Sequence, residues 1–250
     1  MGSFREVEIV WSERLGSLRN VVRQQVIHRQ LTNHTNTAST ALDVGCGQGT
    51  QAIELAARGV EVTGIDPSRD LLETLAATAK ERGVTVETLQ GTLEDLDRLV
   101  GATKYDLVTA HGLMMYLDDP EAAVSALAAR VAGGGTLSIT FRNGAALAYR
   151  PGLRRQWQRA LASFDATTYV NELGAEARAH TLEEMTAWCE ASGLQVERWY
   201  GVRVLTDGVP ADEIPDQHTL ADCIAAELEA GSRDPYRHLG SQLHVIARAR

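Results

Sequence analysis

The stretch Ala41–Thr50, ALDVGCGQGT, constrains the fold of this chain more than any other. Its apolar start predicts a buried strand. Gly45, Gly47 and Gly49 predict a tight turn in which the backbone comes close to a ligand. The apolar spacing of the next residues, TQAIELAARG, predicts a helix. A strand, a glycine-rich turn and a helix in this order indicate a nucleotide-binding α/β fold.

The spacing of the glycines separates one class of nucleotide from another. A dinucleotide fingerprint places its third glycine at position 50, where the chain has Thr50. The pattern here is Asp43-x-Gly45-x-Gly47-x-Gly49, which resembles the first motif of class I S-adenosylmethionine (SAM) dependent methyltransferases. SAM has no pyrophosphate for a helix N-terminus to bind. Its methionine part carries an ammonium and a sulfonium, and the carboxylate of Asp43 suits that positive end. The alternative is a glycine-rich turn that binds no ligand.

The remainder of the chain alternates strands and helices with short connections. Further strands are expected at 60–65, 84–89, 105–110, 136–141, 195–205 and 244–248, with a glycine turn at 133–135. Further helices are expected at 12–31, 71–82, 118–131, 181–192 and 220–230. This order predicts an α/β, Rossmann-like, seven-stranded sheet with its last strand antiparallel, helices on both faces, an N-terminal helical cap and a lid insertion after the fifth strand.

Two parts of the chain are expected to differ in role. Residues 1–40 would form the helical cap and residues 41–250 the SAM-dependent domain, in which residues 142–180 form a lid and acceptor-binding region. Residues 142–164 contain five arginines and no acidic residue: Arg142, Arg150, Arg154, Arg155 and Arg159. One interpretation is a basic patch for an anionic, possibly nucleic-acid, partner. The other is a lid helix whose arginines pair with acids elsewhere. Residues 164–180 are expected to form a loop.

Composition excludes several function classes. The length of 250 residues suits one large α/β domain, and the net charge of −9 argues against a dedicated nucleic-acid binder. Cys46, Cys189 and Cys223 are too widely separated for a disulfide framework or a metal site, which favours a reducing, cytoplasmic location. No apolar run is long enough to cross a bilayer, and the first residues lack the apolar region of a signal peptide.

Several residues after the glycine motif have positions typical of cofactor contacts. Asp66 ends the second strand, where an acid accepts hydrogen bonds from ribose hydroxyls, although it could instead be a helix N-cap. The methyltransferase resemblance implies that Leu93 and Glu94 bind the adenine, with Asp95 as the alternative acid. His111 ends the fourth strand, where it would line the methyl-transfer cavity or stack near the adenosine.

The carboxyl half of the chain carries a narrower resemblance. Its segments are Gly201-Val202-Arg203-Val204, Glu227-Leu228-Glu229, Pro235-Tyr236-Arg237-x-Leu239-Gly240 and His244–Arg248. Together they are similar to the bacterial tRNA 5-carboxymethoxyuridine methyltransferases, which use SAM to esterify a carboxylate on a wobble uridine. That resemblance implies SAM contacts at Arg23, Gly45, Asp66, Leu93-Glu94 and His111. For Arg23, the partner would be the SAM carboxylate, and the alternative is a solvated helix face.

The expected chemistry is direct in-line transfer of a methyl group to an acceptor oxygen. A carboxylate is already ionised near neutral pH, so it needs no general base, and positioning supplies the acceleration. Arg203 and Arg142 are the candidates for binding the acceptor, and Tyr200 for donating a hydrogen bond to it. The alternative for each is an ordinary surface residue or a core-edge pair. A hydroxyl or amine acceptor would need a base, for which His111 and His180 are available.

Three functions are therefore consistent with the sequence. The first is a carboxyl methyltransferase acting on tRNA. The second is a small-molecule O- or N-methyltransferase, favoured by the acidic net charge and by Glu172 and Glu176, which stand where the tRNA-modifying family carries lysines. The third is a SAM-binding regulator without transfer activity. The first predicts tRNA as the anionic partner and the second a small acceptor, for instance a carboxylic acid.

Overall fold

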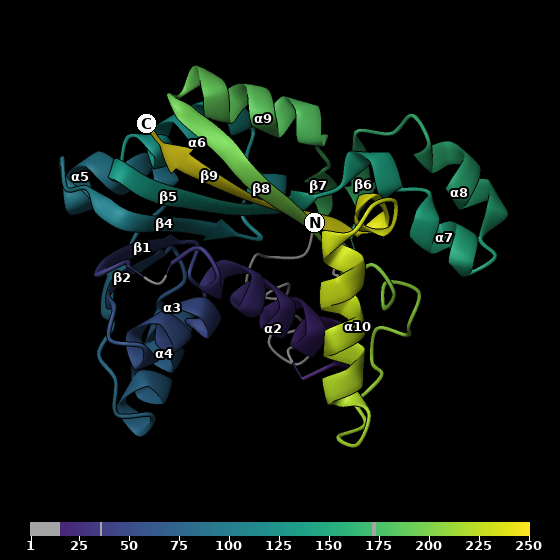
Figure 1. Ribbon diagram of the computed structural model, residues 1–250, viewed down its shortest axis with the longest axis horizontal. Helices are drawn as coiled ribbons and strands as arrows, with labels where there is room; N and C mark the ends of the chain where they lie inside the picture. The colour runs from purple at the N-terminus through teal and green to yellow at the C-terminus, as the bar shows by residue number, and fades with distance from the viewer. Residues whose placement is uncertain (1–15, 36, 172–173) are drawn as a thin grey trace. The chain divides into compact units, whose positions relative to one another are not determined.

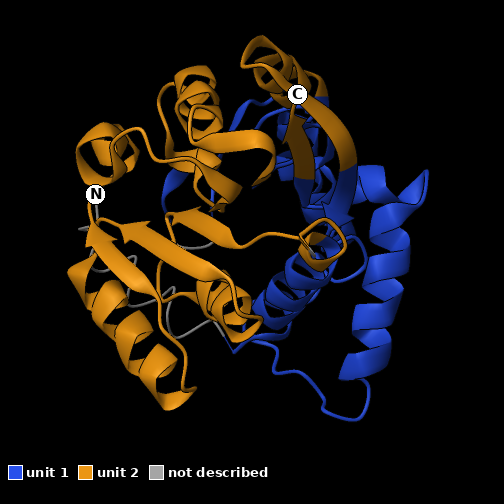
Figure 2. Cartoon of the chain, turned by 60° about the vertical axis from the view of Figure 1, so that its left-hand side comes forward, with its two compact units in different colours: residues 1–30, 141–182, 199–244 blue, residues 31–140, 183–198, 245–250 orange. Residues whose placement is uncertain are grey.

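The computed structural model describes residues 16–35, 37–171 and 174–250 (Figure 1). The chain divides into two compact units (Figure 2). Unit 1 comprises Met1–Gln30, Phe141–Leu182 and Trp199–His244, and unit 2 comprises Leu31–Thr140, Glu183–Arg198 and Val245–Arg250. The expected boundary between residues 1–40 and 41–250 stays a prediction.

A seven-stranded sheet runs through the fold in the order β3-β2-β1-β4-β5-β9-β8. Its strands are β1 (Thr40–Val44), β2 (Glu61–Asp66), β3 (Glu87–Gln90), β4 (Tyr105–His111), β5 (Val131–Arg142), β8 (Leu194–Val202) and β9 (Gln242–Ala249). Strands β1 to β5 pair in parallel, with Ala41 opposite both Val62 and Leu107. One strand, the last in the chain, is antiparallel, which confirms the predicted fold class.

Helices cover both faces of the sheet within unit 2. In Figure 1, α3 (Thr50–Ala57) and α4 (Arg69–Glu81) lie below the strands, and α6 (Pro120–Ala128) and α9 (Leu182–Ala191) lie above them. The shorter helical elements of this unit are η1 (Leu93–Asp95), α5 (Leu96–Val100) and η2 (Met114–Tyr116). A buried cluster joins the glycine-rich turn to the two lower helices through Cys46, Ile53, Leu72, Leu75 and Ala79.

Unit 1 is built around the N-terminal helix and one helix near the carboxyl end. Its elements are α2 (Leu18–Thr32), η3 (Gly144–Ala146), α7 (Tyr149–Leu153), α8 (Trp157–Ser163), β6 (Thr168–Val170), β7 (Glu176–Arg178), α10 (Leu220–Ser232) and η4 (Tyr236–Leu239). Val22, Val26 and Ile27 from α2 pack with Val202 of β8 and Ile224 of α10. The helical spacing of the α2 residues explains why one face of this helix is buried.

Several expected elements need correction. Residues 164–180 are not a loop throughout, because β6 and β7 form an antiparallel hairpin with Thr168 opposite Arg178. Gly174, at φ 78°, and the Asn171 side chain, which accepts from the Ala175 N–H at 3.0 Å, provide the turn. The glycines 133–135 lie inside β5 rather than before it. They form a bulge there, since the register passes from Tyr105–Val131 to Leu107–Thr136.

Element ends also differ from expectation. The third strand begins at Glu87 rather than at position 84, and the segment 149–163 is two short helices separated at Arg155, whose φ is 57°. The strand expected to reach position 205 ends at Val202, because Arg203 adopts a left-handed φ of 55°. The first helix is described from Leu18, and positions 12–15 of the expected helix lie outside the described residues.

Two further findings are limited to the described part of the chain. None of its helices is both long and apolar enough to cross a membrane. Within the same residues, no group of three or more His, Cys, Asp or Glu side chains is arranged to hold a metal ion.

Two glycines of unit 2 with the same backbone conformation provide a first test of the packing. Gly49 and Gly59 have φ values of 83° and 85°, but a Cβ on Gly49 would overlap Leu75 Cγ, whereas one on Gly59 would meet nothing within 4 Å. We expect Gly59→Ala to lower the free energy of unfolding by about 1–2 kcal/mol, the cost of the left-handed conformation. Gly49→Ala should cost about 1–3 kcal/mol more because of overpacking. Denaturant unfolding measures both, and equal costs would contradict the role of the Leu75 contact.

Candidate active site

The glycine-rich turn lies between the end of β1 and the start of α3. Gly45, Gly47 and Gly49 all have positive φ values, of 73°, 53° and 83°. The N–H of Gly45 donates to the carbonyl of Ile65 at 2.8 Å, which ties the turn to β2. A Cβ on Gly45 would lie 3.5 Å from the Leu113 side chain, so the loop after β4 closes over the turn. The glycines therefore serve both the backbone conformation and the close packing.

Asp66 holds the glycine-rich turn through its carboxylate. Its Oδ2 accepts from the Gly47 N–H at 2.8 Å, and its Oδ1 accepts from the Ser68 N–H at 2.9 Å. The N-cap of α4 is Ser68, whose hydroxyl accepts from the Leu71 N–H at 3.2 Å. The interpretation of Asp66 as an N-cap is therefore wrong. Each carboxylate oxygen has two lone pairs, so these bonds leave acceptor capacity for ribose hydroxyls.

Asp43 is a buried carboxylate in the same part of unit 2. Its side chain is 3% exposed, and its Oδ1 accepts from Thr109 Oγ1 at 2.6 Å. Burial raises the pKa of Asp43 to about 6, the Thr109 hydrogen bond opposes this change, and the charge of Asp66 adds to it. Two buried carboxylates that disfavour each other's ionisation form a site for a cation. The residues therefore fit a ligand with a positively charged end, as SAM has.

The structure separates the two acids expected near the adenine. Asp95 accepts from the Thr92 N–H at 3.0 Å and pairs with Arg98 at 2.9 Å, so it caps η1 and is engaged locally. Glu94 is exposed, and Leu93 beside it is buried. Glu94 therefore stays the candidate for the adenine amine, and Leu93 the candidate for the ring.

His111 stands at the end of β4, next to β5. Its Nε2 lies 2.8 Å from Ser138 Oγ, and the following Gly112 N–H donates to Thr140 Oγ1 at 2.9 Å. These contacts fix the chain where β4 leaves the sheet. Unit 2 thus contains these predicted cofactor residues, at or after the carboxyl ends of strands β1 to β4: Asp43, Gly45, Gly47, Gly49, Asp66, Leu93, Glu94 and His111.

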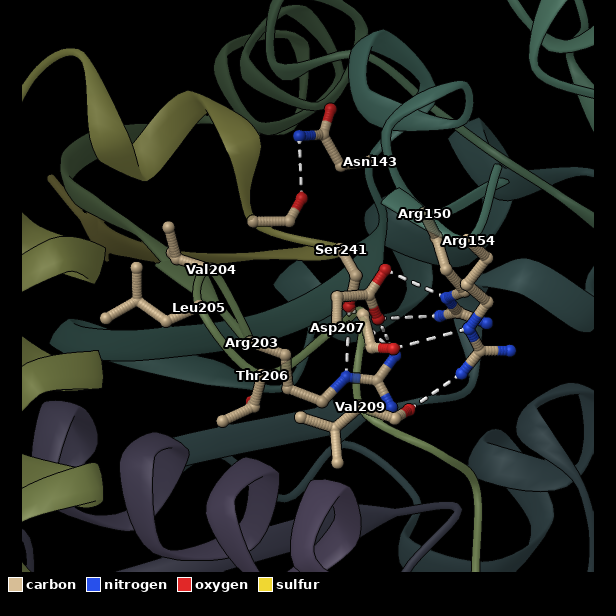
Figure 3. Close-up of polar contacts among 12 residues, drawn as sticks. Asn143, Arg150, Arg154, Arg203, Val204, Leu205, Thr206, Asp207, Val209 and Ser241 are labelled. Carbon is tan, nitrogen blue, oxygen red and sulfur yellow. Dashed lines mark hydrogen bonds and ion pairs between the residues drawn. The ribbon is translucent and has the colours of Figure 1, made fainter. Parts of the chain in front are cut away.

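Unit 1 contains a second polar site, centred on Asp207 (Figure 3). The Asp207 carboxylate is almost fully buried and accepts two hydrogen bonds from Arg150, at 2.8 Å from Nε and 2.7 Å from Nη2. Arg203 Nη2 lies 3.1 Å from the same carboxylate. Arg203 Nε and Nη2 also donate to Ser241 Oγ, at 3.0 and 2.8 Å. We call Arg19, Arg142, Arg150, Arg203 and Asp207 the arginine cluster.

The charges of the arginine cluster act on Arg203 in opposite directions. Burial lowers the pKa of Arg203, the Asp207 carboxylate opposes this change, and the charges of Arg150, Arg19 and Arg142 lower the pKa further. The guanidinium nevertheless stays charged near neutral pH. Arg203 Nη1 donates no hydrogen bond to any residue that the structure describes, and the side chain is 12% exposed. Arg203 therefore offers N–H donors to an anion.

The other predicted site residues of unit 1 are found in separate surroundings. Tyr200 is buried on β8, with its ring centroid 6.0 Å from that of His244. Arg142, at the end of β5, lies with Cζ 5.2 Å from the centre of the Tyr169 ring. His180 is buried, and its backbone N–H donates to the Arg142 carbonyl at 3.0 Å. Arg23 is half-buried on α2. The functional roles of these residues stay predictions.

Two members of the arginine cluster were not singled out as site residues from the sequence. Arg19 lies three and seven residues before Val22 and Val26, so its helical position is on the buried face of α2, and this spacing was the available signal. Asp207 lies in a polar turn region, and no local pattern distinguishes it. Its partner Arg150 is 57 residues away in the sequence.

Comparison with known proteins identifies the class of enzyme. A family profile described as "Methyltransferase domain" matches residues 41–135, which include the glycine-rich turn and Asp66. The tRNA 5-carboxymethoxyuridine methyltransferase of Escherichia coli K12 is 26% identical over 253 residues, covering 96% of this chain and 91% of that protein. The chain is a SAM-dependent methyltransferase.

Other relatives of the methyltransferase act on small molecules. The ubiquinone biosynthesis O-methyltransferase of Rickettsia felis is 35% identical over 138 residues, which is 54% of each chain. Among solved structures, magnesium protoporphyrin IX methyltransferase from Synechocystis with bound SAH aligns at a TM-score of 0.63, with 16% identity over 96% of this chain and 93% of that one. This likeness supports the fold.

The cofactor of the methyltransferase suggests candidate roles for two buried acids of unit 2. When bound, SAM supplies a methyl group on a positively charged sulfur. Asp66 keeps the glycine-rich turn against the end of β2 and is the candidate acceptor for the ribose hydroxyls. Asp43 provides negative charge in a buried position, where electrostatic interactions are strong because water is excluded.

Asp43→Asn should separate stability from cofactor binding. The native state binds the Asp43 proton more tightly than the unfolded chain, whose Asp pKa is about 4. This contribution to stability is therefore present at low pH and is lost as the pH rises through about 6. At neutral pH the substitution removes a buried charge, so we expect the free energy of unfolding to rise by about 1–3 kcal/mol.

The same substitution should weaken SAM binding at neutral pH by about tenfold or more, since a charged partner of the cofactor is lost. The wild-type affinity should fall as the pH decreases below about 6. That of the variant should change little over the same range. Calorimetric titration with SAM at several pH values measures both. An unchanged affinity in the variant would contradict the role of Asp43.

Proposed function

We propose that this methyltransferase transfers a methyl group to a carboxylate, and that the carboxylate is that of 5-carboxymethoxyuridine in tRNA. The observation that carries the proposal is the arginine cluster. Asp207, in a largely buried part of unit 1, pairs with Arg150 and Arg203 and lies within electrostatic range of Arg142. Arg203 combines a guanidinium oriented by Ser241 and Asp207 with further N–H donors, and such a group suits a carboxylate acceptor.

Arg203 is the residue we assign to the acceptor carboxylate. Its Nε and Nη2 are engaged by Ser241 and Asp207, which fix the plane of the guanidinium. Its Nη1 carries two further N–H donors. Arg142 is the second candidate donor, and Tyr200 a candidate for a neutral hydrogen bond.

The proposed reaction needs no general base. A carboxylate with an ordinary pKa is fully ionised at neutral pH and presents a nucleophilic oxygen directly. What the protein must supply is the position of this oxygen and the exclusion of water. His111 and His180 then have no required role in proton transfer, whereas a hydroxyl or amine acceptor would require one.

The relative from E. coli supports tRNA as the carrier of the carboxylate. Its similarity extends over 96% of this chain and therefore includes unit 1, not only the profile-matched residues 41–135. The match to the ubiquinone biosynthesis enzyme covers 54% of this chain. The acceptor-binding part of the chain is thus represented in the comparison with the tRNA-modifying enzyme.

A specific observation favours a small carboxylic acid as the second candidate. Arg150 and Arg154 belong to the basic patch predicted from the sequence. In the structure Arg150 pairs with Asp207, and Arg154 Nη2 donates to the Val209 carbonyl at 2.7 Å. These contacts agree with arginines that pair within the fold, and they reduce the charge available to phosphates. Arg155 and Arg159 stay exposed.

The deciding experiment offers both acceptors to the enzyme with methyl-labelled SAM. One reaction contains tRNA that carries 5-carboxymethoxyuridine, and the other contains a pool of small carboxylic acids. Label in tRNA that mild alkali removes is the expected result, because a methyl ester hydrolyses readily. Label in a small acid alone would establish the second candidate. Alkali-stable label would contradict ester formation.

Arg203→Asn tests the residue that the proposal depends on. Asparagine tolerates a left-handed backbone, so the substitution removes the guanidinium with little added strain. We expect kcat/KM for the carboxylate acceptor to fall about 100-fold, which corresponds to about 3 kcal/mol for charged hydrogen bonds. The affinity for SAM should not change. Arg155→Asn, at φ 57°, is the matched control for the effect of this substitution on stability. A fall of less than threefold in kcat/KM would exclude Arg203 as the acceptor ligand.

A further inference from the structure

Glu227 is a fully buried carboxylate on α10. Its Oε2 accepts from the Val204 N–H at 2.8 Å. Its Oε1 accepts from the N–H groups of Leu205 and Thr206, at 3.1 and 2.7 Å, and from Thr206 Oγ1 at 2.6 Å. One side chain therefore binds three successive backbone N–H groups, in the segment that directly follows Arg203.

The chemistry of these contacts requires a carboxylate. Among the described residues, every partner of Glu227 is a donor, and none is a lysine or arginine. A glutamine of the same shape would turn its NH2 group toward one of the N–H donors and lose that bond. The buried charge is tolerated because four hydrogen bonds satisfy it.

Two neighbours on α10 bring Glu227 into reach of this segment. Gly231, one turn later on the same helix face, packs so closely that a Cβ there would overlap the Gly201 carbonyl oxygen. Ile224, one turn earlier, is buried against Val22, Val26 and Val202. Helix α10 therefore packs against the end of β8 one turn before and one turn after Glu227. The Glu227 carboxylate contacts the residues that follow this strand.

The contacts of Glu227 bear on the backbone conformation of Arg203. This residue has a left-handed φ of 55°, a conformation that is disfavoured for residues with a Cβ. Such strained residues persist when the surrounding structure holds them, and they concentrate at functional sites. The next three residues are held by Glu227, while the Arg203 side chain reaches Ser241 and Asp207. Glu227 itself contacts neither of these partners.

We propose that Glu227 is a positioning residue for the acceptor carboxylate, acting through Arg203. It fixes residues 204–206 and thereby keeps Arg203 in the conformation in which Nε and Nη2 are engaged and Nη1 faces an incoming anion. This inference rests on the proposed function, because it requires the carboxylate to bind at Arg203.

The test compares Glu227→Gln with Glu229→Gln in the full chain. Glu229 lies on the same helix but is exposed, and its carboxylate pairs with Arg233. We expect Glu227→Gln to raise the KM for 5-carboxymethoxyuridine tRNA tenfold or more, with the affinity for SAM unchanged. Hydrogen exchange at the amides of residues 204–206 should accelerate. Glu229→Gln should alter neither quantity.

A double variant separates positioning from general structural support. If Glu227 acts through Arg203, Glu227→Gln should change KM less than twofold in the Arg203→Asn background, because the group it positions is already absent. Thr206→Val removes one of the four hydrogen bonds and keeps the charge. Thr206→Val should raise KM by a smaller factor. This variant tests the positioning role even if Glu227→Gln does not fold.

The outcomes distinguish this inference from the proposed function. Transfer to tRNA by the wild type, with unchanged KM in Glu227→Gln and Thr206→Val, would overturn the positioning role alone. Full additivity of Glu227→Gln and Arg203→Asn would do the same. Failure of the wild type to methylate or bind the tRNA would overturn the proposed function. The positioning role of Glu227 would then be overturned as well.

Discussion

The hydrogen bonds of the Asp66 carboxylate hold together the part of unit 2 that contains the predicted cofactor residues. The carboxylate accepts from the N–H of Gly47 and from that of Ser68, and so joins the glycine-rich turn to the end of β2 and the start of α4. Glu227 does the same in unit 1, where it binds three successive N–H groups after Arg203. In both places a buried acid organises irregular backbone, because the N–H groups there have no strand or helix partner.

The glycine-rich turn and the acids at strand ends could be placed from the sequence, and the contacts of the arginine cluster could not. Asp43, Gly45 and Gly49 act within a few residues of one another, and strand and helix periodicity places Asp66 and His111 at strand ends. The contacts of the arginine cluster join residues that are distant in the sequence. Arg203 and Ser241 are 38 residues apart, and no local pattern links them. The early end of β8 likewise follows from a tertiary interaction, with α10.

Net charge does not describe how charge is distributed within this chain. The chain carries −9 overall, yet in unit 1 two arginines pair with Asp207 and two more act electrostatically on Arg203. Buried charges act over short distances, whereas the net charge describes the solvent-exposed surface and long-range steering. The acidic composition therefore limits how the protein attracts large polyanions. It does not describe the charges around Asp207.

The raised pKa of Asp43 has a consequence for engineering this protein. Without its ligand, the chain carries a buried negative charge that opposes folding at neutral pH. Selection for heat resistance in the absence of SAM would favour neutral side chains at this position, and with them the loss of activity. Selection in the presence of saturating SAM would reverse that preference, because ligand binding adds to the stability of the native state. The condition of a screen, rather than its stringency, would decide whether a stabilised variant still works.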